Sequence, residues 1–287
     1  MSDAGARVHY IPTIEEKLND LFKIKSVSVI KNYYSTEFKK HYGKNITYLF
    51  QIRGENIDVE LYTPFIKSGT TLIMYQWDSI KNFDYTKLIP YFNKSFSFDP
   101  ADCLKFSSLS YFPMFHEIDN KEEQEDINDL LIVASFAYWR YKTIDRFYKL
   151  SQKYQLTSFM KLRLPLKTYV KFYASGKYIN PKLLSIRHIK KSTYTYFLAH
   201  SKVIIDIPSP NQTGLTIRSL EAMAANKKLI TTNKQIVNES FYSPLNTFIL
   251  EDKFNEDLIM DFIQDEKKQY VNMDAFYINN WLLTIFC

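Results

Sequence analysis

Two side chains that could bind a ligand stand three positions apart near residue 220. Arg218 and Glu221 both fall in residues 216–226, which have the length and pattern of a helix of about three turns. An arginine offers a planar fork of donors that suits a phosphate. A glutamate can accept hydrogen bonds from two hydroxyls, such as those of a ribose. Because the spacing places both on one side of a helix, the pair could bind a phosphorylated ligand that also carries hydroxyls.

The segments around this helix predict a βαβ unit. Apolar runs at residues 202–207 and 227–232 read as parallel strands joined by the helix, and ligands of open α/β sheets bind at the carboxyl ends of such strands. Gly214 stands near the helix start, where free N–H groups and the helix dipole attract an anion. The alternative is that Arg218 and Glu221 form a helix-surface ion pair worth about 0.3–0.5 kcal/mol.

The rest of the chain alternates between strand-like and helix-like segments. Short apolar runs rich in β-branched or aromatic residues predict strands, and apolar residues recurring every three or four positions predict helices. Strands are predicted at residues 46–52, 70–77, 93–99, 108–115, 130–138 and 160–165. Helices are predicted at residues 14–43, in a segment that ends near residue 67, at residues 140–154, in the region up to residue 178, and at residues 186–200. The alternation in both halves predicts two α/β units with mostly parallel sheets.

An acidic run at residues 119–129, with one apolar residue, is the candidate interdomain linker. The predicted domains are therefore residues 1–122 and 123–270. Residues 271–287 form an apolar tail that either packs back on the first domain or marks where a longer protein was cut.

Composition excludes several classes of protein. The chain has 287 residues, 46% hydrophobic and 24% charged, which is a globular balance rather than a disordered or fibrous one. Its two cysteines, Cys103 and Cys287, lie far apart and outside any metal-ligand spacing, so a reducing compartment is expected. The N-terminus has no signal-peptide pattern, and no run reaches the ~20 apolar residues of a membrane span. A cytoplasmic protein is expected.

The net charge of +6 could favour nucleic acid, anionic lipid or a phosphorylated ligand. The basic residues look scattered among acidic ones, so no nucleic-acid partner is expected. A weak attraction to the inner face of an anionic membrane is expected instead. The 22 Tyr and 22 Phe reflect either compositional bias or a surface that stacks on sugars or bases.

Residues 212–233, QTGLTIRSLEAMAANKKLITTN, resemble the donor-binding segment of GT-B glycosyltransferases. That segment has a glycine-containing loop, a glutamate followed by Ala-Met-Ala or a near variant, and a strand with a Thr or Ser run. More closely, the chain resembles bacterial glycosyltransferases of lipopolysaccharide-core and capsule synthesis. Four further segments match that group in order: residues 52–57, 75–82, 96–102 and 111–115. The resemblance spans residues 50–240.

The resemblance implies an α/β fold with two Rossmann-like domains that face each other across a cleft. The C-terminal domain would hold a nucleotide-sugar donor, and a glycan or glycolipid acceptor would approach from the N-terminal domain. Glu221 would bind the ribose hydroxyls, and Arg218 with the amides of Gly214 and Leu215 would face the diphosphate. The full implied donor site comprises Gln212, Gly214, Leu215, Thr216, Arg218, Glu221, Thr231, Thr232, Asn233, Arg140 and Arg146.

Sugar transfer requires neutralisation of the leaving diphosphate and deprotonation of the acceptor hydroxyl. The chain has no Asp-x-Asp metal motif in a suitable loop, so positive side chains and a helix N-terminus are expected to replace a metal ion. Asp78, at the end of a predicted strand, is the candidate base, with Glu55 and His116 as weaker candidates. The alternative for Asp78 is an N-cap of a following helix, and for His116 a structural role.

The chain has only 6 Gly and lacks the glycine-rich loop of the family after its first strand. Few glycines mean few close approaches of backbone to phosphate. The alternative function is therefore a catalytically silent relative that binds a nucleotide sugar or a partner enzyme.

Overall fold

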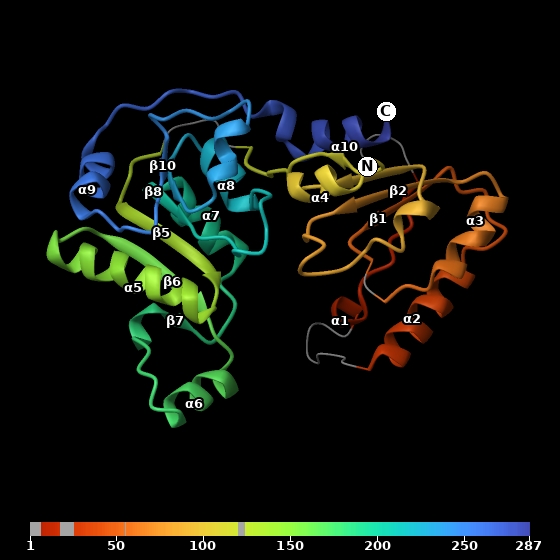
Figure 1. The fold of residues 1–287 in the computed structure, drawn as a ribbon, viewed down its shortest axis with the longest axis horizontal. Coiled ribbons are helices and arrows are strands. Elements are labelled where there is room, and N and C mark those ends of the chain that lie inside the picture. The colour runs from red at the N-terminus through yellow and green to blue at the C-terminus, as the bar shows by residue number, and fades with distance from the viewer. Residues whose placement is uncertain (1–6, 18–25, 55, 120–123) are drawn as a thin grey trace. The chain divides into compact units, whose positions relative to one another are not determined.

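The computed structural model describes residues 7–17, 26–54, 56–119 and 124–287, and it divides the chain into two compact units (Figure 1). The first unit comprises Met1–Pro113 and Pro210–Gly214, and the second comprises Met114–Ser209 and Leu215–Cys287. Each unit contains its own sheet. Among the described residues, no helix has the length and apolar character needed to cross a bilayer.

The first unit is built on a four-stranded sheet in the order β1-β2-β3-β4, with every pair parallel. Its central strand β2 is almost wholly buried, as its apolar run predicts. The elements are α1 (Ile14–Lys17), α2 (Val27–Lys39), β1 (Tyr48–Ile52), η2 (Val59–Tyr62), α3 (Thr63–Lys67), β2 (Thr71–Gln76), η3 (Ile89–Tyr91), β3 (Lys94–Ser97), α4 (Pro100–Lys105) and β4 (Ser110–Tyr111). The core lies between β2 and the helices and contains Tyr62, Leu72 and Met74.

The second unit is built on a six-stranded parallel sheet in the order β10-β9-β8-β5-β6-β7. The elements are β5 (Asn128–Ser135), α5 (Tyr138–Lys153), β6 (Ser158–Arg163), α6 (Leu166–Ala174), η4 (Pro181–Leu183), β7 (Leu184–Ser185), α7 (Lys191–Ala199), β8 (Ser201–Asp206), α8 (Ile217–Ala224), β9 (Lys228–Thr231), η5 (Lys234–Asn238), β10 (Thr247–Ile249), α9 (Glu256–Gln264), η6 (Asp274–Phe276) and α10 (Ile278–Phe286). The chain moves outward from β5 to β7 and then returns to β8 on the other side of β5. The boundary between β5 and β8 is thus a topological switch point.

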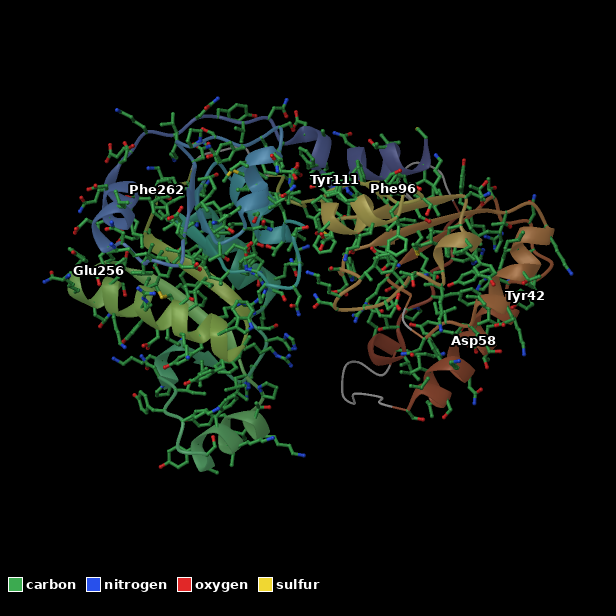
Figure 2. The ribbon with its side chains drawn as sticks, in the orientation of Figure 1. Tyr42, Asp58, Phe96, Tyr111, Glu256 and Phe262 are labelled. Atoms are coloured by element: carbon green, nitrogen blue, oxygen red, sulfur yellow. The ribbon has the colours of Figure 1, made fainter. Side chains whose placement is uncertain are left out.

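Separate hydrophobic clusters cover the two faces of this sheet. Helices α5 and α9 pack on one face, and α7 and α8 on the other. Figure 1 shows α5 and α8 on opposite sides of β5, and Figure 2 shows the side chains, with Glu256 and Phe262 labelled on α9. The spacing of buried residues along α5, at Tyr141, Ile144 and Phe147, explains why its sequence forms an amphipathic helix.

The prediction of an α/β chain with two units of mostly parallel sheet is confirmed. The arrangement of the units across a cleft stays a prediction, as do the domain limits at residue 122 and the packing of the tail. The predicted helix at 14–43 is found as α1 and α2, with residues 18–25 outside the described part of the chain. The predicted helix at 186–200 begins only at Lys191, because the preceding Lys190 has an extended backbone.

Candidate functional site

Arg140 joins the ends of two strands at the switch point. It lies in the first turn of α5, directly after β5. Its Nε donates to the carbonyl of Ile207, just beyond β8, at 2.7 Å, and its Nη1 donates to the carbonyl of Ser135, at the end of β5, at 2.6 Å. The guanidinium is therefore held at the carboxyl edge of the sheet between β5 and β8.

Arg218, in the first turn of α8, bridges the same two strands. Its Nε donates to the carbonyl of Val133 in β5 at 2.6 Å, and its Nη1 lies 3.4 Å from Oδ1 of Asp206, the last residue of β8. Asp206 is buried, and its Oδ2 also accepts from the hydroxyls of Thr216 at 2.6 Å and Ser219 at 3.0 Å. The carboxylate is thus shared between two hydroxyls and one long ion pair.

The guanidiniums of Arg140 and Arg218 lie close enough at the switch point to repel each other. Burial and the nearby charge of Arg218 lower the pKa of Arg140 to about 10, with Asp206 opposing that change. The guanidinium stays charged at pH 7. The repulsion between these two guanidiniums favours a bound anion, since an added negative charge would relieve it.

The start of α8 adds backbone donors at the same place. Thr216 occupies the N-cap position, but its hydroxyl donates to Asp206 and does not accept from the helix amides. The first N–H groups of α8 therefore have no side-chain cap and can serve an anion. The helix ends at Ala224, and Asn226, two residues further on, has a φ of 53°, the left-handed conformation usual after a helix.

Arg163 is a residue that the sequence reasoning missed. It is the last residue of β6 and pairs in register with Ser135 at the end of β5. Four residues before it, Phe159 packs in the cluster under α7 and α8, so the two-residue period places Arg163 on that same face. Its Nε is buried without a hydrogen-bond partner among the described residues. The position of this arginine at the end of the strand after β5 was the available signal.

Glu221 lies one turn after Arg218 on α8, and Tyr194 of α7 donates to its Oε2 at 2.7 Å. Burial raises the pKa of Glu221, while the Tyr194 hydrogen bond and the Arg218 charge lower it. Within the described chain, no ion pair joins Arg218 to Glu221. The alternative of a helix-surface pair is therefore wrong.

The raised pKa of Glu221 provides a pH test of its predicted role in binding a ribose. The ionised carboxylate accepts ribose hydroxyls best, so affinity should fall as pH drops, beginning at a higher pH than for an ordinary glutamate. We expect this fall in calorimetric titrations of the protein with a nucleoside diphosphate between pH 8 and pH 5. Each unit by which the ligand changes the pKa of Glu221 corresponds to ~1.4 kcal/mol of binding free energy. Glu221→Gln is the control, because it should remove this component and leave titration of the phosphate unchanged. Identical pH profiles for both proteins would contradict the role of Glu221.

Gly214 lies in a loop that belongs to the first unit, where it meets Phe98. A Cβ at Gly214 would stand 2.4 Å from the Phe98 carbonyl oxygen and 2.6 Å from its ring. The buried Asp99 holds this loop by accepting from the amide of Thr213 at 3.1 Å and from its hydroxyl. Gly214 is therefore a close-packing position in the first unit.

Two other predicted donor residues flank this glycine. Gln212 Nε2 donates to the Gly214 carbonyl at 3.3 Å, while the side chain of Leu215 is buried in the α8 cluster of the second unit. The roles of their backbone groups toward a diphosphate stay predictions.

Thr231 and Asn233 serve the local structure after β9. The hydroxyl of Thr231 accepts from the amide of Asn233 at 3.1 Å, and Oδ1 of Asn233 caps η5 through the amide of Gln235 at 3.0 Å. Between them, Thr232 lines a pocket. The two flanking side chains are therefore occupied, and only Thr232 of this run reaches an open site.

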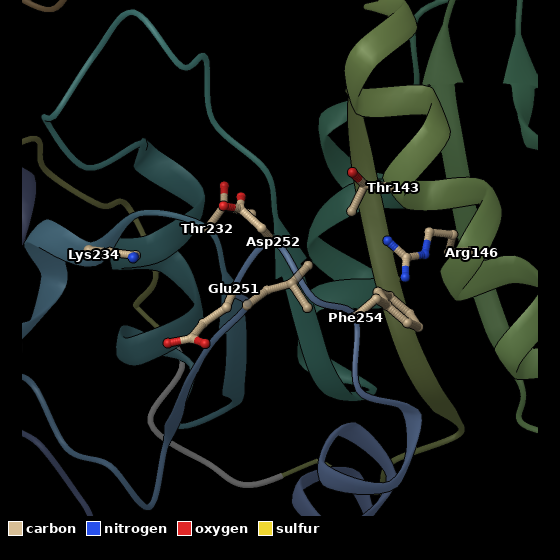
Figure 3. A pocket seen from close by; sticks show the side chains of 8 residues that line it. Thr143, Arg146, Thr232, Lys234, Glu251, Asp252 and Phe254 are labelled. Carbon is tan, nitrogen blue, oxygen red and sulfur yellow. The ribbon is translucent and has the colours of Figure 1, made fainter.

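The pocket lies in the second unit at the ends of β9 and β10 and has a volume of about 220 Å³. Figure 3 shows Arg146 beside Phe254 on one side and Lys234 on the other, and the guanidinium lies 4.2 Å from the centre of the Phe254 ring. The lining residues are Thr143, Arg146, Thr232, Lys234, Leu250, Glu251, Asp252 and Phe254. Arg146 and Thr232 thus share a pocket that neither Arg140, Arg218 nor Glu221 lines.

In the first unit, Asp78 follows β2 and pairs with Arg53, with 3.1 Å between Oδ2 and Nε. The alternative of an N-cap is wrong, because a turn follows Asp78 in place of a helix. The amides of Ile80 and Lys81 bond instead to the side chains of Asp102 and Ser79. Glu55, the second candidate base, lies outside the described residues.

His116 has a structural role in the second unit. It is buried, its Nδ1 accepts from the amide of Ile118 at 3.2 Å, and its Nε2 lies 3.0 Å from the carbonyl of Met273. These contacts define the neutral tautomer with hydrogen on Nε2, and burial lowers the pKa. The structural alternative for this histidine is confirmed.

Comparison with known proteins identifies the architecture. The UDP-GlcNAc 2-epimerase from Methanocaldococcus jannaschii superposes with a TM-score of 0.52 at 10% identity, covering 94% of this chain and 88% of that one. The Staphylococcus aureus protein MnaA, solved with UDP, gives 0.52 at 8% identity, covering 91% and 84%. The chain shares their fold. Its two Rossmann-like α/β units are those of the GT-B class. No family model and no curated protein sequence matches the chain.

Proposed function

We propose that this chain is a glycosyltransferase that moves a sugar from a nucleotide-sugar donor to a hydroxyl of a cell-surface polysaccharide or lipopolysaccharide acceptor. The observation that carries the proposal is that Arg140 and Arg218 both join β5 to β8 at the switch point of the second unit. Ligands of open parallel sheets bind at such a point. Guanidinium forks suit the two phosphates of a nucleotide sugar.

During transfer the bond from the anomeric carbon to the diphosphate breaks, and the acceptor oxygen forms the new bond as it loses its proton. In this proposal Arg140, Arg218 and the α8 amides neutralise the leaving diphosphate in place of a metal ion. Arg163 supports them from β6, and Glu221 holds the ribose. Asp78 accepts the proton, with Glu55 as the second candidate.

A catalytically silent protein that binds a nucleotide sugar is the second candidate function. The observation that favours it is the ion pair between Asp78 and Arg53. One oxygen of the carboxylate is then occupied by the guanidinium and cannot take a proton from an acceptor hydroxyl while the pair holds. The two functions share the donor site and differ in turnover.

Binding and turnover test the proposal in sequence. A ligand that binds only the folded protein raises its apparent stability, so at least one of UDP, GDP, CMP and TDP should raise the melting temperature. Sugar release or transfer from the corresponding donors is then followed with and without glycan acceptors. Turnover should be lost in Glu221→Ala and kept in Glu256→Ala, a solvent-facing glutamate of the same unit that pairs with Lys153.

Three outcomes decide between the candidates. Transfer to an acceptor supports the glycosyltransferase. Nucleotide binding without turnover of any donor supports the silent binding protein and contradicts the transferase. No stabilisation by any nucleotide contradicts both, because the arginine pair would then bind no nucleotide.

A further inference from the structure

Helix α6 presents an apolar stripe that the chain itself leaves uncovered. Leu166, Val170 and Tyr173, which are 55%, 56% and 76% exposed, follow one another at spacings of four and three and so lie on one side of the helix. Tyr178, just beyond it, is 80% exposed. Figure 1 shows α6 projecting from the sheet of the second unit, in the connection between β6 and β7.

The opposite side of α6 fixes the helix in place. Tyr169 and Phe172 pack against the core beneath α5, and the Phe172 ring lies 5.4 Å from that of Phe136 and 6.0 Å from that of Tyr138. The exposed stripe is therefore held outward on a docked helix. An aromatic and aliphatic surface kept in solvent on a docked element is typical of an interaction site.

The charge around the stripe is of one sign. Residues 146–205 contain 13 of the 37 Lys and Arg and none of the 31 Asp and Glu, so this segment carries +13 and the rest of the chain −7. The expectation that basic residues are scattered among acidic ones is therefore wrong for this segment. On α6 itself, Lys167 and Lys171 are exposed next to members of the stripe, and Lys177 is exposed just after it.

We propose that α6 and its flanking lysines dock this protein on an anionic lipid surface. The apolar stripe would enter the boundary between headgroups and acyl chains, where Tyr is favoured. The lysines would contact anionic headgroups, each contributing about 1 kcal/mol near the surface. A nucleic acid would use the lysines but has no need of an exposed aliphatic stripe, so lipid explains both features. The docking proposal does not depend on the proposed sugar transfer.

The test measures partitioning of the whole chain onto vesicles by co-sedimentation. The wild type should pellet with vesicles of phosphatidylcholine and phosphatidylglycerol in equal parts and stay in solution with phosphatidylcholine alone. Removing three charges by Lys167→Gln, Lys171→Gln and Lys177→Gln should weaken partitioning by about 100-fold. The matched control removes three exposed lysines of the first unit, Lys39, Lys67 and Lys87, and should retain wild-type partitioning.

The apolar stripe is tested separately by Val170→Glu and by Tyr173→Ser. Both should abolish pelleting while the melting temperature stays within a few degrees of the wild type, because neither side chain is buried. The proposal would be overturned if the wild type and the Val170→Glu variant pelleted equally, or if the control lysine variant lost as much partitioning as the variant that lacks Lys167, Lys171 and Lys177. Binding to an oligonucleotide in place of vesicles would overturn it as well. A dimer that Val170→Glu dissociates without any vesicle binding would also overturn it, in favour of a second copy.

Discussion

Arg218→Ala should weaken binding of a nucleoside diphosphate by roughly 10- to 150-fold. The expectation follows from the value of a hydrogen bond to a charged group, about 1.5–3 kcal/mol, and from the position of Arg218 at the switch point. The fold should survive the change, because Asp206 keeps its hydrogen bonds from Thr216 and Ser219. Calorimetric titration with a nucleoside diphosphate and with the matching nucleoside measures the effect.

The nucleoside separates a phosphate contact from general damage. It lacks the diphosphate, so its weaker binding should change little in Arg218→Ala. Arg218→Lys should recover part of the diphosphate affinity, because lysine keeps the charge but loses the planar fork. Arg187→Ala is the matched control, since Arg187 is an exposed arginine of the same unit that follows the edge strand β7, and the affinity of this variant should equal that of the wild type. Equal losses for the nucleoside and the diphosphate would contradict a phosphate contact.

Gly214→Ala should destabilise the protein by about 3 kcal/mol, the upper end of the usual cost of overpacking. The added methyl would stand 2.4 Å from the carbonyl oxygen of Phe98, a backbone atom that cannot turn aside as a flexible side chain can. Relief requires a shift of the loop away from Asp99, which would lengthen its hydrogen bonds to Thr213. Urea unfolding of both proteins measures the difference.

Gly43→Ala is the matched control for this prediction. Gly43 has a φ of 73° and nothing within 4 Å of its missing Cβ, so alanine there meets only conformational strain, about 1–2 kcal/mol. Gly214 is not in the left-handed region, and its cost comes from contact alone. A smaller loss of unfolding free energy in Gly214→Ala than in Gly43→Ala would show that the loop moves freely. The packing role of Gly214 would then be wrong.

The sequence by itself determined the parallel α/β architecture. The apolar runs at β2 and β8, and the loop and helix between β8 and β9, predict buried parallel strands with a crossover because hydrophobic pattern and length are local properties. The same pattern placed Arg218 and Glu221 on one helix near the end of a strand. The sequence also contains the segment around α6 that has basic residues and no acidic ones. This segment is found only when both basic and acidic residues are counted.

Only the tertiary structure decided which of these residues act together. Arg140 and Arg218 are 78 positions apart in the chain, and they meet because β5 and β8 are neighbours across a reversal of strand order. Arg163 joins that edge because β6 pairs with β5, whereas Arg146, only six residues after Arg140, lines a different pocket. Gly214, read from sequence as part of a phosphate loop, packs on Phe98 in the first unit. The local pattern sets the face on which a side chain lies, but strand order and register set its neighbours, because they come from contacts between distant parts of the chain.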